Sequence, residues 1–317
     1  MWTGKKSTLT LISIALSCLI LGAAIGIGGY SFYLNAFKKS PKDQKITPVQ
    51  IYSSPTHCNN EKLYDNLDDA LIEVNQVCKL DLSFHNFSAL PLEVTQLSNL
   101  EELRLDNNQF TSLPPEISRL KSLKILTVRN NKLSSLPSQI RSLTQLEVFS
   151  LRNNKLASLP AEIQGLKSLK ILGLRDNFLT TLPQEIGQLT NLTDIYLGHN
   201  QLEKLPTEIT HLQNLSTLVL AQNQFVEIIP EITQLHNLSL LNLRNNKLKS
   251  LPPQVVNLSE LKYLSIANNP ISHLPDGMSK LKKLIKLYVT GTSIPQEEIK
   301  NLKDNLPQLS ISTTDIE

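Results

Sequence analysis

Three arginines at a constant spacing are the residues of this sequence best suited to binding a charged ligand. Arg129, Arg152 and Arg175 are each 23 residues apart, and Asp106 precedes them at the same spacing. If the four lie side by side on neighbouring strands, Asp106 can pair with Arg129, whereas Arg152 has an arginine on both sides. Like charges directly opposite one another are destabilising. An acidic partner would compensate for that repulsion, and so would solvent around splayed side chains.

Apolar residues recur at the same spacing beside these arginines. Ile125, Val148 and Ile171 predict a short aliphatic strip that faces outward next to the basic row. A basic row beside an apolar strip is typical of an interaction surface, although single exposed apolar residues are common on any protein. Tyrosine is also favoured at interfaces. The candidate partner-binding set is completed by Tyr196, Tyr263 and Tyr288.

The sequence contains no recognisable catalytic or cofactor-binding motif. It has no G-x-S-x-G element, phosphate-binding glycine loop or kinase signature. The best candidate metal cluster fits no common zinc spacing and consists of His57, Cys58, Cys78 and His85. We therefore expect no enzyme activity, no metal and no cofactor. A net charge of +3 and an aromatic content of 5% also argue against a nucleic-acid surface, which needs clustered basic and stacking aromatic side chains.

The constant spacing reflects an internal repeat. In "LRNNKLASLPAEIQGLKSLK" (151–170), a short strand ends at Leu151, Leu156 and Leu159 line the following turn, and "LPAEIQGL" starts a helical or 3₁₀-like return. A repeat of this length indicates a solenoid, in which each unit stacks on its neighbours and buries one continuous core. Val77 opens the series, and the leucines that mark the period are Leu100, Leu123, Leu146, Leu169, Leu192, Leu215, Leu238, Leu261 and Leu284.

The pattern L-x-x-L-x-L-x-x-N-x-L resembles the leucine-rich repeat over residues 77–306, as nine full units and a partial tenth. The L-P-x-E-I wording resembles the 23-residue class found in bacterial and Ras-suppressor-like proteins. The resemblance implies an α/β fold, a horseshoe-shaped solenoid with a parallel sheet on its concave face. It also implies protein recognition through that face.

One asparagine in each unit is expected to be structural. Its side chain should point inward where the chain leaves the strand and bond backbone groups that would otherwise be buried without partners. The series fails only at its ends, at His85 and Thr292, where terminal units face water. The predicted ladder is Asn108, Asn131, Asn154, Asn177, Asn200, Asn223, Asn246 and Asn269.

The first part of the chain differs from the repeats. No charge lies between Lys6 and Lys38, and residues 9–33 are long enough to cross a bilayer as a helix. We expect a short tail (1–8), an uncleaved transmembrane anchor (9–33) and a linker (34–60). The alternatives are a cleaved secretory signal and a lipoprotein modified at Cys18.

The orientation of this anchor is not given by charge. Lysines flank the span on both sides, so the positive-inside rule has no clear answer. Because a short amino terminus usually stays inside, we expect the repeats on the extracytoplasmic side. Gly22 and Gly26 form G-x-x-x-G within the span, a spacing that lets two membrane helices pack closely and that makes a homodimer a further hypothesis.

Both ends of the solenoid core need cover. Residues 61–76 predict a cap helix on which Leu67, Ala70 and Leu71 share a face and Asp65 or Asn66 caps the start. Residues 295–317 predict a closing helix. A disulfide between Cys58 and Cys78 would pin the first cap to the solenoid, and two unrelated thiols are the alternative.

The sequence therefore predicts a membrane-anchored leucine-rich repeat protein that binds a protein partner through its concave face. A structural envelope scaffold, or an adhesin whose repeats associate with one another, is the alternative. The fold itself does not identify the partner.

Overall fold

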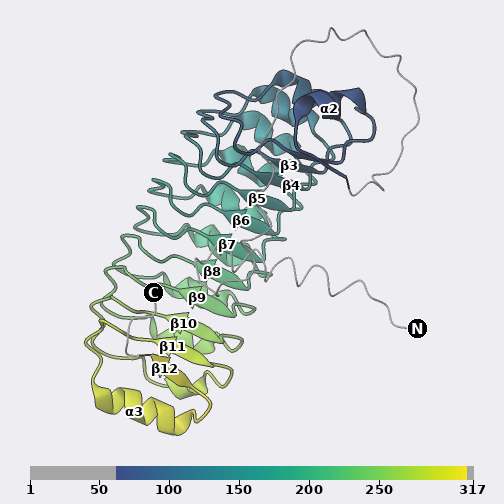
Figure 1. Cartoon of the computed structure of the whole chain (residues 1–317). Helices are drawn as coiled ribbons and strands as arrows, with labels where there is room; N and C mark the ends of the chain where they lie inside the picture. The colour runs from purple at the N-terminus through teal and green to yellow at the C-terminus, as the bar shows by residue number, and fades with distance from the viewer. Residues whose placement is uncertain (1–61, 313–317) are drawn as a thin grey trace, which may run out of the picture. The chain divides into compact units, whose positions relative to one another are not determined.

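The computed structural model describes residues 62–312. They form a single parallel sheet of twelve strands, in which each strand lies between the strands that precede and follow it in sequence (Figure 1). Equivalent residues of successive units pair in register, Ile125 with Val148 and Val148 with Ile171. The predicted parallel sheet of a leucine-rich repeat solenoid is thus confirmed. Its strands are β1 (Leu63–Tyr64), β2 (Lys79–Asp81), β3 (Glu102–Arg104), β4 (Ile125–Thr127), β5 (Val148–Ser150), β6 (Ile171–Gly173), β7 (Asp194–Tyr196), β8 (Thr217–Val219), β9 (Leu240–Asn242), β10 (Tyr263–Ser265), β11 (Lys286–Tyr288) and β12 (Ser310–Ser312).

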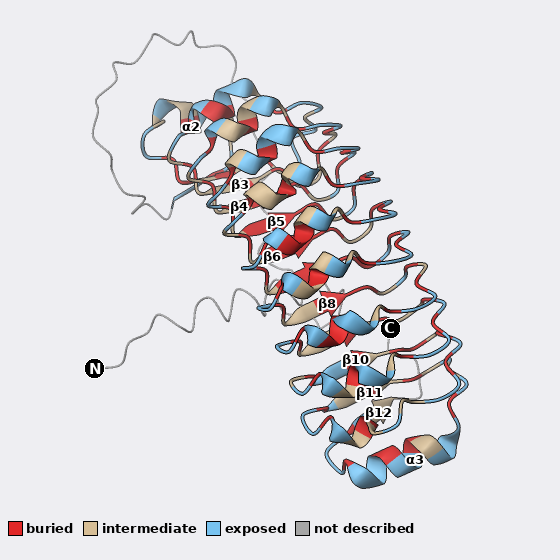
Figure 2. Ribbon diagram, turned by 180° about the vertical axis from the view of Figure 1, so that it is seen from behind, coloured by how far each residue is buried: buried red, intermediate tan, exposed pale blue. Residues whose placement is uncertain are grey.

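The return of most units is a short 3₁₀ helix that covers one face of the sheet (Figure 2). Proline starts many of these turns because its fixed φ suits the position and no backbone N–H is needed there. Pro137, for example, is extended (φ −70°, ψ 147°), and its carbonyl accepts a 3.0 Å hydrogen bond from the Ile140 N–H. The 3₁₀ helices are η2 (Leu92–Gln96), η3 (Pro115–Arg119), η4 (Ser138–Ser142), η5 (Ala161–Gly165), η6 (Gln184–Gln188), η7 (Thr207–His211), η8 (Pro230–Gln234), η9 (Pro253–Asn257) and η10 (Met278–Lys280).

The core lies between the sheet and these 3₁₀ helices. The central residue of each strand points into it, since successive strand residues face opposite sides. Phe149 and Leu172 have no exposed surface, and neither do Ile140 and Ile163 from the facing turns. All belong to one continuous cluster. The first and last residues of each strand therefore form a separate outer surface, here called the strand face.

Asn154 illustrates how each ladder asparagine links neighbouring coils. Its Nδ2 donates to the carbonyls of Val128 at 2.8 Å and Leu151 at 2.9 Å, and its Oδ1 accepts from the Leu133 N–H at 3.0 Å. At each predicted position from Asn108 to Asn269 the side chain bonds the preceding coil in the same way, and all eight are buried. At the predicted ends, Thr292 instead bonds within its own turn, to the Val289 carbonyl at 2.7 Å.

The residue before each ladder asparagine has a left-handed backbone conformation, as in Asn153 with φ 55°. Asparagine tolerates this conformation well. The Nδ2 atoms of Asn130 and Asn153 each donate to the Oδ1 of the equivalent residue one coil earlier, at 2.8 and 2.9 Å. This second, more exposed series comprises Asn107, Asn130, Asn153, Asp176, His199, Gln222, Asn245 and Asn268.

Two glycines allow close contact between neighbouring 3₁₀ helices. A Cβ atom at Gly165 would overlap the backbone of Arg141, and one at Gly187 would overlap the backbone of Glu208. Gly198, beside the strand face, has more room, because the nearest atom to its Cβ position would be 3.4 Å away. The two tightly packed positions therefore exclude any side chain, whereas Gly198 does not.

Short helices lie at both ends of the described chain. At the first end, α2 (Leu67–Ile72) begins after Asn66, whose Oδ1 accepts a 2.7 Å hydrogen bond from the Asp69 N–H. Ala70 is fully buried on its inner side. At the other end, α3 (Gln296–Asn305) buries Ile299 and Leu302, and β12 extends the sheet by one more strand.

Several predictions fall outside residues 62–312. They concern the tail (1–8), the anchor (9–33) with Gly22 and Gly26, the linker (34–60) and Cys58. Within the described range, no helix is both long and apolar enough to span a membrane. Cys78 is 4% exposed and disulfide-bonded, and its partner lies outside the described range, so the pairing with Cys58 stays a prediction.

Candidate partner-binding surface

The aliphatic strip lies on the strand face. In-register pairing brings Ile125, Val148 and Ile171 side by side as the first residues of β4, β5 and β6. None of the three belongs to the core cluster. They are less open than the sequence suggests, since Val148 and Ile171 are each only 8% exposed. Parallel strands lie about 4.8 Å apart, so each branched side chain packs against its neighbours in the row.

The last residues of the same strands are small. Thr127, Ser150 and Gly173 are aligned by the same register. A Cβ atom at Gly173 would lie 3.2 Å from the Ser150 Oγ, which shows how little side-chain volume this row contains. The small residues lie between the aliphatic strip and the arginines. Each arginine is the second residue after the end of its strand.

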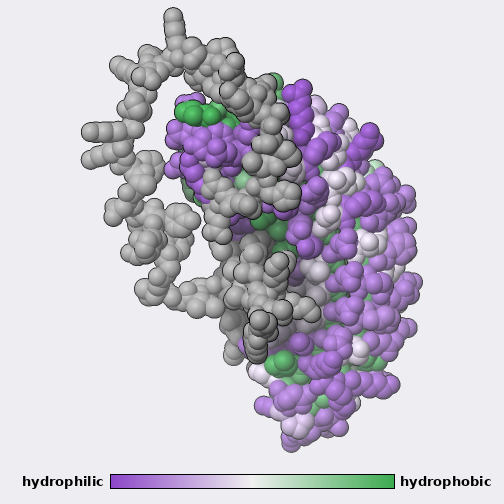
Figure 3. All heavy atoms as spheres, turned by 90° about the vertical axis from the view of Figure 1, so that its right-hand side faces the viewer, coloured by the Kyte–Doolittle hydropathy of each residue, from purple (hydrophilic) through white to green (hydrophobic). Residues whose placement is uncertain are grey.

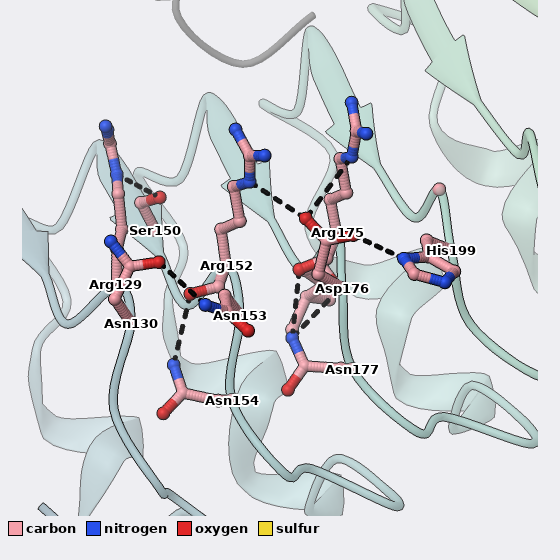
Figure 4. Close-up of polar contacts among 12 residues, drawn as sticks. Arg129, Asn130, Ser150, Arg152, Asn153, Asn154, Arg175, Asp176, Asn177 and His199 are labelled. Carbon is pink, nitrogen blue, oxygen red and sulfur yellow. Dashed lines mark hydrogen bonds and ion pairs between the residues drawn. The ribbon is translucent and has the colours of Figure 1, made fainter. Parts of the chain in front are cut away.

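The three arginines are held by partners within the chain. The Nε of Arg129 donates to the Ser150 Oγ at 2.8 Å, and the Nε of Arg152 donates to Asp176 Oδ2 at 2.9 Å (Figure 4). The same carboxylate oxygen lies 3.4 Å from the Arg175 Nε. The repulsion that the sequence implies around Arg152 is thus compensated inside the protein by Asp176. The charge of Arg152 still acts on Arg129, whose pKa is lowered mainly by burial and also by that neighbouring charge.

The sequence pattern did not single out Asp176, because this residue does not occupy the arginine position of the repeat. It takes the left-handed position where three preceding units have asparagine, with φ 58°. Asp176 is the single carboxylate among the residues at that left-handed position, and this is the sequence feature that could have identified it. Its Oδ1 also contacts the His199 Nδ1 at 2.6 Å. Asp176 therefore joins three side chains from three successive coils.

The pKa values in this row follow from burial and these contacts. Burial alone would raise the pKa of Asp176, but hydrogen bonds from His199 and Arg152 and the charge of Arg175 outweigh burial and lower it. At the other end, burial raises the pKa of Asp106, and the hydrogen bond from Arg129 only partly opposes that rise. Burial also lowers the pKa of the Arg129 guanidinium.

The pairing of Asp106 with Arg129 uses the backbone. The Arg129 N–H donates to Asp106 Oδ1 at 2.6 Å, while the guanidinium turns to Ser150. In Figure 4 the terminal nitrogens of Arg129 and Arg152 point away from Ser150 and Asp176. Two guanidinium groups are therefore fixed through their inner Nε atoms, with their outer edges directed away from the protein. Such an edge matches a carboxylate in a two-point contact.

A neighbouring row of alternating charges, Glu101, Lys124, Glu147 and Lys170, is paired within the chain. The Nζ of Lys124 lies 2.8 Å from Glu101 Oε1, and the Nζ of Lys170 lies 2.7 Å from Glu147 Oε2. These pairs connect adjacent strands and satisfy one another. They are structural supports at the side of the strand face, and the arginine row is the part with outward-directed charge.

The three tyrosines do not form one cluster. Tyr196 is opposite Gly173 in the adjacent strand and is 2% exposed. Tyr263 is 39% exposed in β10, and Lys286 lies with its Nζ 5.7 Å from the ring centre of Tyr288 in β11. Only Tyr196 adjoins the rows described above. The other two belong to the far end of the sheet.

The described surface offers no metal site. Within residues 62–312, no group of three or more histidine, cysteine or acidic side chains is placed to hold an ion. In the view of Figure 3, the visible described surface is mainly hydrophilic, with small hydrophobic patches. A mainly hydrophilic surface with small apolar patches suits polar recognition over an extended area.

Comparison with known proteins identifies related sequences and folds. The family model described as "Leucine-rich repeat region" matches residues 139–240 and 229–316, and the model "Leucine rich repeat" matches residues 98–156. No curated protein matches. One similar solved structure is the plant peptide hormone receptor RGFR1 in complex with RGF2, with 27% identity, a TM-score of 0.56, and coverage of 78% of this chain and 46% of that one.

Two further structures have similar coverage. The receptor kinase ectodomain GASSHO1/SCHENGEN3 from Arabidopsis thaliana, in complex with CASPARIAN STRIP INTEGRITY FACTOR 2, has 26% identity and a TM-score of 0.57 over 80% of this chain and 34% of that one. The functional domain of InlJ from Listeria monocytogenes has 20% identity and a TM-score of 0.62 over 80% and 53%. The chain thus spans about half or less of the length of these three relatives.

Proposed function

Because this chain belongs to the leucine-rich repeat family, we propose that it recognises another protein through its strand face. The ligand is an acidic, extended segment of that partner. The observation that carries the proposal is the fixed arginine row, in which Ser150 and Asp176 hold Arg129 and Arg152 by their Nε atoms. A side chain that is already ordered loses less entropy on binding.

The rows beside the arginines support an extended ligand. Thr127, Ser150 and Gly173 leave little side-chain volume between the arginines and the aliphatic strip. A peptide backbone lying across the strands would have space there. Carboxylates of the peptide would meet Arg129 and Arg152, and its apolar side chains would meet Ile125, Val148 and Ile171. The similar plant structures RGFR1 with RGF2 and GASSHO1 with its integrity factor contain bound ligands, which agrees with recognition of a peptide segment.

We further propose that residues 9–33 anchor the protein in a membrane, with the repeats on the extracytoplasmic side. The support is the uncharged apolar run between Lys6 and Lys38. Residues 34–60 would then tether the repeats near the bilayer. Pairing of two anchors through Gly22 and Gly26 would place two strand faces together and increase avidity for a repetitive ligand.

Affinity capture from membrane extract tests the proposed recognition. Full-length wild type is compared with Arg129→Gln plus Arg152→Gln, and with Arg141→Gln as the matched control. Arg141 belongs to η4, so its substitution removes the same charge from the opposite side of the solenoid. Retention of a distinct protein by wild type and by the control, with its loss from the double variant, supports the proposal. Equal capture by all three, or capture of the same chain alone, contradicts it and favours the scaffold alternative.

A further inference from the structure

A polar groove lies beside the arginine row, where the chain leaves β6 to β9. It has a volume of about 440 Å³, within the range of about 300–1,000 Å³ that small-molecule sites occupy. Ladder asparagines at its back are already bonded to backbone groups. The remaining lining side chains, here called the amide groove, are Phe178, His199, Gln201, Gln222, Gln224 and Asn245.

The three glutamine amides of this groove differ in their bonding from the asparagine amides of neighbouring coils. Asn130 and Asn153 are linked to the preceding coil by side-chain hydrogen bonds, and Asn268 donates to Asn245 at 2.7 Å. Gln222 occupies the same position of the repeat between these bonded residues, and it interrupts the row of side-chain hydrogen bonds. Within residues 62–312, the side-chain amides of Gln201, Gln222 and Gln224 make no hydrogen bond. Each amide has donors and an acceptor available to a ligand.

Phe178 gives the groove an aromatic wall. It is 50% exposed at the repeat position that is lysine in the two preceding units, Lys132 and Lys155. Lysine returns at the same position in Lys247. The row therefore carries no charge between Lys155 and Lys247, the stretch that contains the groove. The exposed aromatic ring thus lies beside hydrogen-bonding amides, including that of Gln201 in the next coil.

We propose that the amide groove binds a neutral carbohydrate. Sugar hydroxyls donate and accept hydrogen bonds, as side-chain amides do. The C–H face of a sugar ring is attracted to the negative face of an aromatic ring, which Phe178 supplies. The lining of the groove contains no lysine or arginine to select an anion, and the Nδ1 of His199 contacts Asp176 at 2.6 Å. The site is distinct from the arginine row in both position and ligand chemistry.

The test uses the full-length chain in a detergent without a sugar headgroup. An array of neutral oligosaccharides built from hexoses, deoxyhexoses and N-acetylhexosamines identifies the best binder, which is then titrated by calorimetry. We expect Phe178→Ala and Gln222→Ala each to weaken binding roughly tenfold, as happens when a central contact residue is truncated. Phe178→Tyr keeps the aromatic face and should retain binding.

Two controls separate this site from the rest of the protein. Gln109 has the same repeat position as Gln201 and Gln224 but lies outside the groove, so Gln109→Ala should leave affinity unchanged. Arg129→Gln should also have no effect. The proposal is overturned if no oligosaccharide of the array binds. It is equally overturned if binding is insensitive to Phe178→Ala and Gln222→Ala, or if Gln109→Ala weakens it as much as they do.

Discussion

The Nε of Arg152 donates a 2.9 Å hydrogen bond to Oδ2 of Asp176, a residue of the following coil. This contact offsets part of the repulsion among the three aligned arginines, because one carboxylate lies within reach of both Arg152 and Arg175. It also orders the guanidinium before any ligand arrives. The surface therefore combines stability with outward-directed charge, and each property can be tested separately.

Replacing Asp176 by asparagine should destabilise the fold by about 1 kcal/mol near neutral pH, as expected for partly exposed charge pairs in a network. The pKa of Asp176 is lowered in the folded protein. Its stabilising contribution is therefore complete above the unfolded-state pKa and is lost as pH falls through the lowered folded-state pKa. Thermal unfolding of wild type and Asp176→Asn at a series of pH values should show their difference shrinking towards acid. A difference that is unchanged at about pH 2–3 would contradict this account.

Partner binding should weaken as salt rises from about 0.1 M to about 1 M, because the screening length falls from about 10 Å to about 3 Å. Arg152→Gln should lower the affinity roughly tenfold and flatten the salt dependence. Surface plasmon resonance with the captured partner measures both effects, and Arg141→Gln serves as the control. Binding that changes neither with salt nor with Arg152→Gln would exclude the arginine row and leave the aliphatic strip as the binding surface.

Asn154→Ala should cost about 2–4 kcal/mol in the free energy of unfolding. The change leaves the Leu133 N–H and the Val128 carbonyl without the bonds that Asn154 provides, and each unsatisfied buried group costs about 1–3 kcal/mol. Urea denaturation gives the measurement. The adjacent control is Asn153→Gly, which suits the left-handed backbone of that exposed residue and should cost far less. Similar losses for both variants would refute a structural role specific to the ladder.

Gly187→Ala should destabilise the protein by about 1–3 kcal/mol, the usual effect of overpacking. Its Cβ atom would overlap the Glu208 backbone, whereas the nearest atom to a Cβ at Gly198 is 3.4 Å away. Gly198→Ala is thus expected to change stability by less than about 0.5 kcal/mol. Differential scanning calorimetry of the two variants checks the contrast. Equal unfolding temperatures would show that the coils can separate at Gly187 without cost.

The full-length chain should remain in the membrane fraction after an alkaline carbonate wash, and deletion of residues 1–40 should release a soluble folded fragment. The reason is the uncharged apolar run from 9 to 33. Fractionation followed by amino-terminal sequencing tests both statements. Mature protein that begins near Ile25 and washes off freely would indicate a cleaved signal instead.

The repeat period made the fold predictable because one residue pattern determines which side chain enters the core. Leu126 and Phe149 occupy equivalent repeat positions, and both are fully buried. The backbone bonds of Asn154 could also be anticipated, since a buried polar side chain at the end of a strand needs partners. The sequence left the return of each unit open between a helical and a 3₁₀-like form. In the units around Pro137 and Pro160 it is a 3₁₀ helix.

The candidate site was only partly predictable. The sequence aligned Arg129, Arg152 and Arg175, but it did not show that Asp176 turns back towards two of them. That direction depends on a left-handed backbone at Asp176, which the hydrophobic period does not encode. Exposure was also hard to judge, because the packing of Val148 and Ile171 within the strand face depends on neighbouring coils.

Each ladder asparagine joins its own coil to the preceding one, as Asn154 does with Val128 and Leu133. If unequal recombination adds or removes one complete unit of the gene, every remaining asparagine meets an equivalent carbonyl and amide in its new neighbours. A change of any other length shifts those atoms out of reach. The length of the strand face can therefore evolve in steps of one coil, while the composition of each coil remains under the same selection.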